Sequence, residues 1–103
     1  STSQPKPSWV ERKERYIERL RAELAELKLI SAADKLHNAQ SIVRDQVKIG
    51  DEVFERFSAE KSQTLWYYRA VVAALADGWD HVLVHELDAL VDRMHALGGV
   101  SRS

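Results

Sequence analysis

The sequence contains no cysteine, only two prolines and four glycines, and neither sign of charge is in clear excess. Without cysteine the chain has no disulfides and no thiolate metal site, which fits a reducing compartment, so we expect a cytoplasmic protein. Its 15 basic and 16 acidic side chains leave a formal charge of −1, and the basic face that nucleic-acid binding needs is therefore not expected. No apolar run approaches the roughly 20 residues of a membrane span, and no signal-peptide pattern opens the chain.

The composition that is present favours one small helical domain. The chain has 103 residues, of which 45% are hydrophobic and 30% charged. We expect a flexible tail over residues 1–7, a single helical domain over residues 8–99 and a second tail over residues 100–103. The first residue is not Met, and "STSQPKPS" has the composition of a flexible lead-in or a cut end, so we expect a fragment of a longer protein.

Two apolar stripes at helical spacing occupy the first half of the chain. Ser8, with Glu11 three residues later, is a capping-box signature for a helix whose inner face carries Trp9, Lys13, Tyr16, Ile17, Leu20, Leu24 and Leu27. The next stripe contains Leu29, Ala33, Leu36, Gln40, Val43 and Val47. It lies half a turn from the first when about 100° per residue is counted. A break near residues 25–28 would let both stripes face one core.

The second half of the chain predicts two more helices. After a stop at Gly50, a short helical turn over residues 52–57 is expected to bury Phe54 and Phe57. A helix from Ser58 to Asp77–Gly78 would bury Leu65, Tyr68, Val72 and Leu75. A last helix from Asp80 to Gly98–Gly99 would bury Leu83, Leu87, Leu90, Met94 and Leu97. With no strand signal, the fold class is all-α with four helices.

The stretch "ISAADKLHNA" places polar side chains beside the second apolar stripe. Asp34, His37, Asn38, Ser41 and Asp45 fall along one flank of a helix. Asp34 and His37 are three residues apart and could reach one metal ion or one substrate group. The alternative is a half-exposed polar flank in which Asp34 pairs with a neighbouring Arg, and spacing alone favours that alternative.

The segment "SAADKLHNAQSI" resembles the "ADKLxN" segment of the HD-domain metal-dependent phosphohydrolases, especially the guanosine-polyphosphate hydrolases of the RelA/SpoT and Mesh types. "PSWVERKERYIERLR" and "TLWYYRAVVAAL" look like the helices before and after that segment, so the resemblance spans residues 7–75. It implies that Asp34 is the last of the metal ligands, that Asn38 contacts the substrate and that Lys35 makes structural ion pairs. The implied cofactor is a divalent ion such as Mn, Fe or Mg, which activates a water for attack at phosphorus. The implied substrate is a nucleotide or another phosphate ester or pyrophosphate.

The chain departs from that family in its histidines. It has no His-Asp dipeptide, and its other histidines, His81, His85 and His95, follow the motif instead of preceding it. Three of the four family ligands are therefore missing, and we expect a C-terminal HD-like segment that is inactive alone, or a degenerate relative. The alternative from another class is a non-catalytic helical interaction module, with self-association into a homo-oligomer through the surface that missing helices would cover.

Two further clusters have competing interpretations. His81, His85, Asp88 and Asp92 share one helix face and could bind Zn²⁺ or Ni²⁺, but that face lies opposite the apolar stripe and a solvated outer face is favoured. The cluster Trp66, Tyr67 and Tyr68 is either an aromatic wall for a base or sugar near Asn38 or part of the core. Core packing is favoured, since Tyr68 falls on the third apolar stripe and the other two do not.

Overall fold

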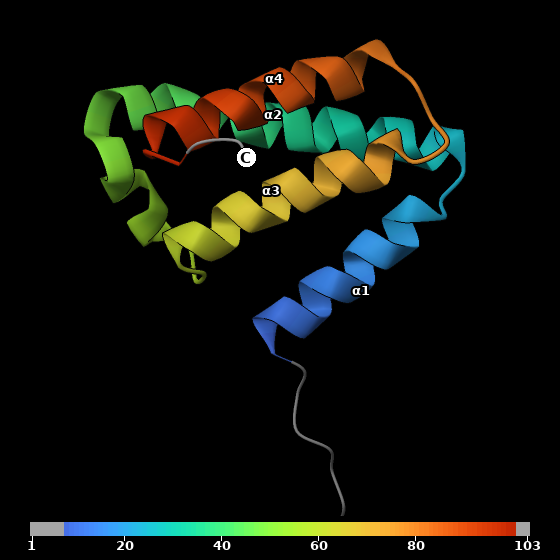
Figure 1. Ribbon diagram of the computed structural model, residues 1–103, viewed down its shortest axis with the longest axis horizontal. Helices are drawn as coiled ribbons and strands as arrows, with labels where there is room; N and C mark the ends of the chain where they lie inside the picture. The colour runs from blue at the N-terminus through green and yellow to red at the C-terminus, as the bar shows by residue number, and fades with distance from the viewer. Residues whose placement is uncertain (1–7, 101–103) are drawn as a thin grey trace, which may run out of the picture.

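The computed structural model describes residues 8–100 and consists of helices joined by short connections. In chain order they are α1 (Trp9–Arg21), α2 (Ala25–Ile49), the 3-10 helix η1 (Gly50–Arg56), α3 (Lys61–Ala76) and α4 (Val82–Leu97) (Figure 1). The described residues contain no strand, so the predicted all-α class with four helices is confirmed. Within this described part, no helix combines the length and the apolar character needed to cross a membrane. The tail predicted over residues 1–7 lies outside the described residues, and so does the tail predicted over residues 100–103 except for Val100.

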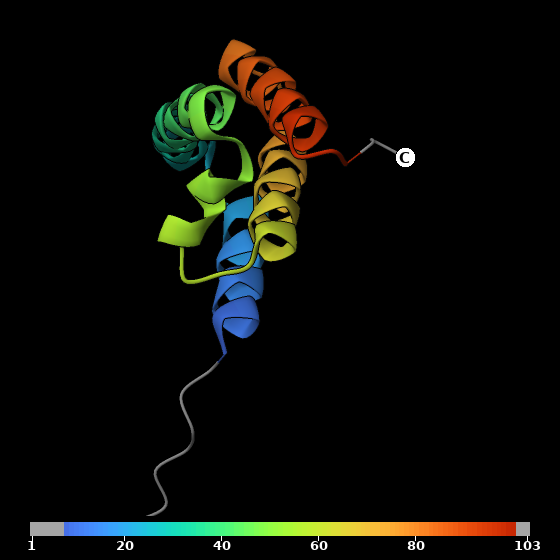
Figure 2. The same cartoon turned by 90° about the vertical axis from the view of Figure 1, so that its left-hand side faces the viewer.

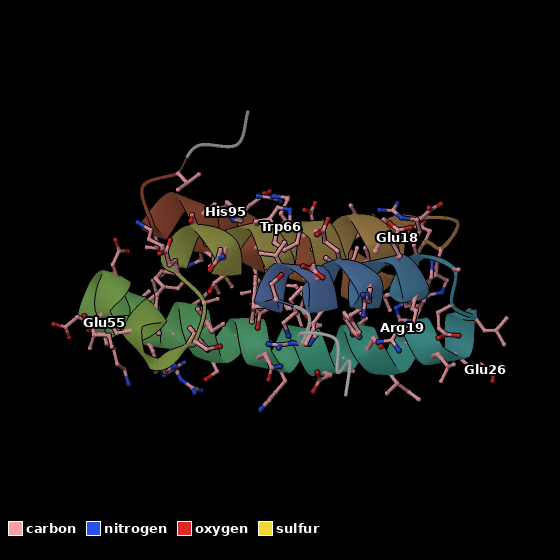
Figure 3. The ribbon with its side chains drawn as sticks, turned by 90° about the horizontal axis from the view of Figure 1, so that it is seen from below. Glu18, Arg19, Glu26, Glu55, Trp66 and His95 are labelled. Atoms are coloured by element: carbon pink, nitrogen blue, oxygen red, sulfur yellow. The ribbon has the colours of Figure 1, made fainter. Side chains whose placement is uncertain are left out.

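The four helices pack around one core. α2 packs along α4, and α3 packs against both α4 and α1 (Figures 1 and 2). η1 folds back from the end of α2 and contacts both α2 and α3. The largest fully buried side chains are Val53, Val71, Leu75, Leu87, Val91 and Met94. Seen from below, α1 lies in front of α2 and α3 and between them (Figure 3). These three helices therefore border the same side of the molecule.

The start of α1 and the break after it follow local sequence signals. Ser8 Oγ accepts a hydrogen bond of 3.1 Å from the Glu11 amide, so the predicted N-cap is confirmed. The predicted break exists, but it falls at residues 22–24, slightly earlier than expected. Leu24 and Leu27 are 70% and 45% exposed, so their assignment to the inner face of the first helix was wrong. The turn ends α1 before these residues, and they no longer follow its helical phase.

The buried face of α2 is rotated from the predicted one. The buried residues are Lys28, Ala32, Ala39, Ile42, Val43 and Gln46, whereas the predicted Leu29, Ala33, Gln40 and Val47 are exposed. The buried face differs from the predicted one because the polar side chains of Lys28 and Gln46 face inward. Lys28 Nζ donates to the carbonyls of Ala74 (3.3 Å) and Asp77 (2.6 Å), and Gln46 Nε2 donates to the carbonyl of Met94 (2.9 Å). These bonds satisfy groups that would otherwise be costly to bury.

The later elements agree more closely with expectation. Gly50 ends α2 with a φ of 64°, a left-handed value that favours glycine. Leu65, Tyr68, Val72 and Leu75 of α3 are all buried, as predicted. That helix begins at Lys61 instead of Ser58, because the Glu60 and Gln63 side chains form a capping box there.

Three details of the second half differ from the prediction. Phe54 is buried, but Phe57 is only half-buried at the edge of the core. α4 begins at Val82, because the His81 imidazole caps the helix by accepting a hydrogen bond from the Leu83 amide. Leu87 and Met94 are buried and Leu83 and Leu90 are half-buried, whereas Leu97 is exposed and was wrongly placed in the core.

Candidate functional site

Asp34 lies in the middle of α2 with its carboxylate directed toward solvent. Its side chain is 63% exposed, and its Oδ2 lies 3.7 Å from the ammonium of Lys35. The predicted polar flank therefore exists, although the ion-pair partner is a lysine and not an arginine. Asn38, one turn further along, is half-buried, and His37 between them is exposed. The metal role of Asp34 and the substrate role of Asn38 stay predictions.

Lys35 points into the protein, toward α1 and α3. Its side chain is only 15% exposed, and its Nζ lies 5.4 Å from the ring centroids of both Tyr16 and Tyr67. Lys35 therefore does more than the surface ion pairing expected of it, because it joins the motif on α2 to an aromatic cluster.

That aromatic cluster is built mainly from α1 and α3. Tyr67 packs edge-on against Trp9 and Tyr68, with centroid separations of 6.1 and 5.6 Å, and Trp9 also contacts Trp66 at 6.3 Å. Tyr67 and Tyr68 are both buried and therefore belong to the core, although the sequence pattern placed only Tyr68 on the buried stripe. Trp66 is exposed at the edge of the cluster.

A cavity of about 260 Å³ opens beside this cluster, between α1, α2, α3 and the chain that enters α3. We call it the basic cavity. Its lining includes two lysines, three aromatic residues and a threonine: Lys13, Lys35, Trp9, Tyr67, Tyr68 and Thr64. None of the residues that line it is acidic. Tyr67 and Tyr68, predicted as substrate contacts, therefore line a cavity and also belong to the core.

The charges around the basic cavity perturb one another. Burial, and then the nearby charge of Lys35, lowers the pKa of Lys13. Burial also disfavours the Lys35 ammonium, but the negative charge that Tyr67, Tyr16 and Tyr68 carry when they ionise outweighs it, so the pKa of Lys35 is raised. Burial raises the pKa of Tyr67 and of Tyr68, with Lys35 acting in the opposite direction. The tyrosines are therefore neutral near pH 7, and the cavity carries positive charge.

The competing cluster on α4 does not converge on one point. Arg69 of α3 bonds to Asp88 and Asp92 at 3.3 and 2.8 Å, and so draws both carboxylates toward α3. His81 caps its own helix, and the exposed His85 pairs with Asp80 at 2.6 Å. In the described part of the chain, no three His, Cys, Asp or Glu side chains are grouped so that they could hold a metal ion.

The sequence prediction missed the two lysines of the basic cavity. Lys13 was placed on the inner face of the first helix without a binding role, and Lys35 was expected only to make structural ion pairs. A lysine inside an otherwise apolar stripe was the available signal in the case of Lys13. Comparison with known proteins adds no assignment, because no family model matches the chain and no curated protein resembles it significantly. The site is therefore interpreted from its own chemistry.

Proposed function

We propose that this chain is the C-terminal part of an HD-type metal-dependent phosphohydrolase that acts on a nucleotide or another phosphate ester or pyrophosphate. One observation carries the proposal: the Asp34 carboxylate lies 3.7 Å from the Lys35 ammonium, which lines the basic cavity. An exposed carboxylate that is available to a metal ion thus neighbours Lys35, which belongs to a cavity whose positive charge suits a phosphate. Metal-dependent hydrolysis of a phosphate ester uses a carboxylate that binds the metal ion and, close to it, positive charge that stabilises the phosphoryl oxygens.

The described residues supply only part of that machinery. Asp34 is exposed, so its oxygens can reach an ion that other side chains also bind. One carboxylate does not hold a catalytic divalent ion, and no complete ligand group occurs among the described residues. The residues present therefore do not fit a whole metal site, and we assign no catalytic step to this segment by itself. We expect it to be inactive in isolation.

The first test of this proposal is the coding sequence upstream of Ser1. It should encode a His followed by a His-Asp pair, which together complete the family's ligand set. If neither occurs there, the proposed enzyme function is wrong.

The second test uses the full-length protein. We expect it to bind a divalent ion and to release phosphate or pyrophosphate from nucleotides, with both properties lost in Asp34→Asn, because the amide is a neutral and weaker ligand. The measurements are metal content by elemental analysis and phosphate release. The matched control is Glu26→Gln, an exposed carboxylate on the same helix. Unchanged metal content and activity in Asp34→Asn would contradict the ligand role.

A second candidate function, an interaction module, is favoured by the apolar surface at the start of α2. Leu24, Leu27 and Ile30 are exposed there, with Ile30 at 65%. Leu27 and Ile30 line a groove together with Arg19 and Glu23, residues of opposite charge. A two-fold pairing could place each Arg19 opposite the partner's Glu23, so the occupant we propose is a second copy of this chain.

This alternative predicts concentration-dependent dimerisation. Ile30→Lys should weaken the dimer, because it buries a charge in an apolar contact. Val47→Lys, at an exposed apolar position near the other end of the same helix, should not. Sedimentation equilibrium of both variants and the parent distinguishes the outcomes. A chain that is monomeric at all concentrations, or equal effects of the two substitutions, would exclude this interface.

A further inference from the structure

The basic cavity holds two cationic groups around one aromatic ring. The Nζ atoms of Lys13 and Lys35 lie 4.7 and 5.4 Å from the centroid of Tyr67. Both distances are within the range of a cation–π contact, which partly stabilises each ammonium group. The two like charges nevertheless repel each other, and the lowered pKa of Lys13 reflects both this repulsion and burial.

The positive charge in this cavity is poorly compensated by the protein. Within the described part of the chain, Lys13 makes no ion pair, and its ring contacts are with Trp9 and Tyr67. Among the described residues, the only carboxylate that pairs with Lys35 is that of Asp34, at 3.7 Å and exposed to solvent. An anion inside the cavity would relieve the repulsion between the two lysines and contact both of them. A partly buried pair of cations without a carboxylate in its lining is therefore an anion-binding arrangement.

The size and the walls of the cavity restrict which anion it can hold. A volume of about 260 Å³ is just below the roughly 300–1,000 Å³ of typical small-molecule sites, so the cavity suits a small ligand or one group of a larger ligand. A phosphate group with a small part of its ester does fit. Lysine binds phosphate as a point charge, and Trp9 and Tyr68 offer ring surface to an organic group.

We propose that the basic cavity binds the phosphoryl group of a phosphorylated small molecule, with Lys13 and Lys35 as its two cationic contacts. The biological role of this binding rests on the phosphohydrolase function proposed above, where the cavity would hold phosphate beside the Asp34 carboxylate. The binding itself requires no metal ion. It can therefore be measured on the 103-residue chain as it stands.

The test titrates the metal-free chain with phenyl phosphate, inorganic phosphate and phenol, followed by nuclear magnetic resonance of the indole N–H groups. We expect phenyl phosphate to bind more tightly than inorganic phosphate, and phenol to bind least. The Trp9 signal should shift, whereas that of Trp79, which is stacked on His81 outside the cavity lining, should not. Absence of binding, or equal shifts at both tryptophans, would overturn the proposal.

Substitutions of the two lysines identify the site. Lys13→Met and Lys35→Met should each weaken phenyl phosphate binding by about ten- to a hundredfold, the effect of losing one bond to a charged group. Lys13→Arg keeps the charge and should restore most of the affinity, which separates a ligand contact from a folding defect. The exposed Lys48→Met is the matched control and should bind like the parent. Binding that survives both methionine substitutions would overturn the assignment.

The two proposals can fail separately. If the chain binds no phosphate but the full-length protein needs Asp34 for metal and activity, the cavity assignment is wrong and the phosphohydrolase function stands. If the cavity binds phosphate through both lysines but the full-length protein shows no metal binding or activity that depends on Asp34, the phosphohydrolase function is wrong and the cavity assignment stands.

Discussion

Lys28→Met tests the unexpected burial of a lysine in α2. Lys28 is 3% exposed, and its Nζ donates to the carbonyls of Ala74 and Asp77 at the C-terminal end of α3. Carbonyl groups at a helix C-terminus lack partners within the helix and carry partial negative charge, so an ammonium group satisfies them and opposes the helix dipole. Methionine keeps the unbranched stem, so the substitution removes the charge without opening a large cavity.

The expected loss of stability follows from the two carbonyls. The Ala74 carbonyl keeps its hydrogen bond from the Asp77 amide, so the substitution removes only its buried bond to the charged Lys28 ammonium, which contributes about 1.5–3 kcal/mol. The Asp77 carbonyl is only partly buried, so water replaces most of that bond. Losing the favourable interaction with the helix dipole adds roughly 0.3–1 kcal/mol to this loss. In the opposite direction, methionine avoids the free-energy cost of burying a charge, which offsets part of the loss. We expect a net destabilisation of about 2 kcal/mol.

Urea unfolding followed by circular dichroism measures this effect. With a slope of roughly 1–3 kcal/mol per molar urea for a small domain, the midpoint should fall by about 1 M. The control is Lys48→Met on the same helix, which is exposed and should change stability by less than about 0.5 kcal/mol. If Lys28→Met is as stable as the parent or more stable, the bonds to α3 do not outweigh the cost of burying the ammonium, and the reasoning is refuted.

Three further predictions concern a cap, the core and alkaline pH. Ser8→Ala should destabilise α1 by about 1 kcal/mol in urea unfolding, whereas no change would mean that the cap bond contributes nothing. Leu87→Ala should cost about 2–5 kcal/mol because the side chain is fully buried, against less than about 0.5 kcal/mol for the exposed Val82→Ala. The pKa values of Tyr67 and Tyr68 are raised, so above pH 10.0 these hydroxyls keep their protons in the folded state but lose them in the unfolded state. The free energy of unfolding should therefore fall as the pH rises beyond that point. A urea midpoint that stays constant there, or a fall that Tyr67→Phe leaves equally large, would contradict this assignment.

Much of the fold could be predicted from local signals. The Ser8 cap, the stop at Gly50 and the buried stripe of α3 each depend on residues within a few positions of one another. Such interactions are encoded in short segments, so periodicity and capping rules detect them. The boundaries were less accurate, because Glu60 and His81, which were not expected as caps, determine where α3 and α4 begin.

The candidate site could be predicted only in part. The motif led to Asp34 and Asn38, and the aromatic run led to Tyr67 and Tyr68. Nothing in the sequence placed Lys13 in a cavity with Lys35, because the two residues lie on different helices and line one cavity only in the packed structure. The metal and substrate roles of these residues stay predictions that the experiments above address.

The sequence by itself determined an all-α chain of four helices, since helix formers, caps and apolar periodicity act over a few residues. Only the tertiary structure decided which face of α2 is buried. Lys28 and Gln46 face inward because their partners, 46 to 49 residues away along the chain, are carbonyls near the ends of α3 and α4. A hydropathy pattern treats such side chains as surface residues, whereas the packed structure gives acceptors to the Lys28 ammonium and the Gln46 Nε2 and buries both side chains. The same packing directs Lys35 inward and leaves Asp34, its neighbour in the chain, in solvent.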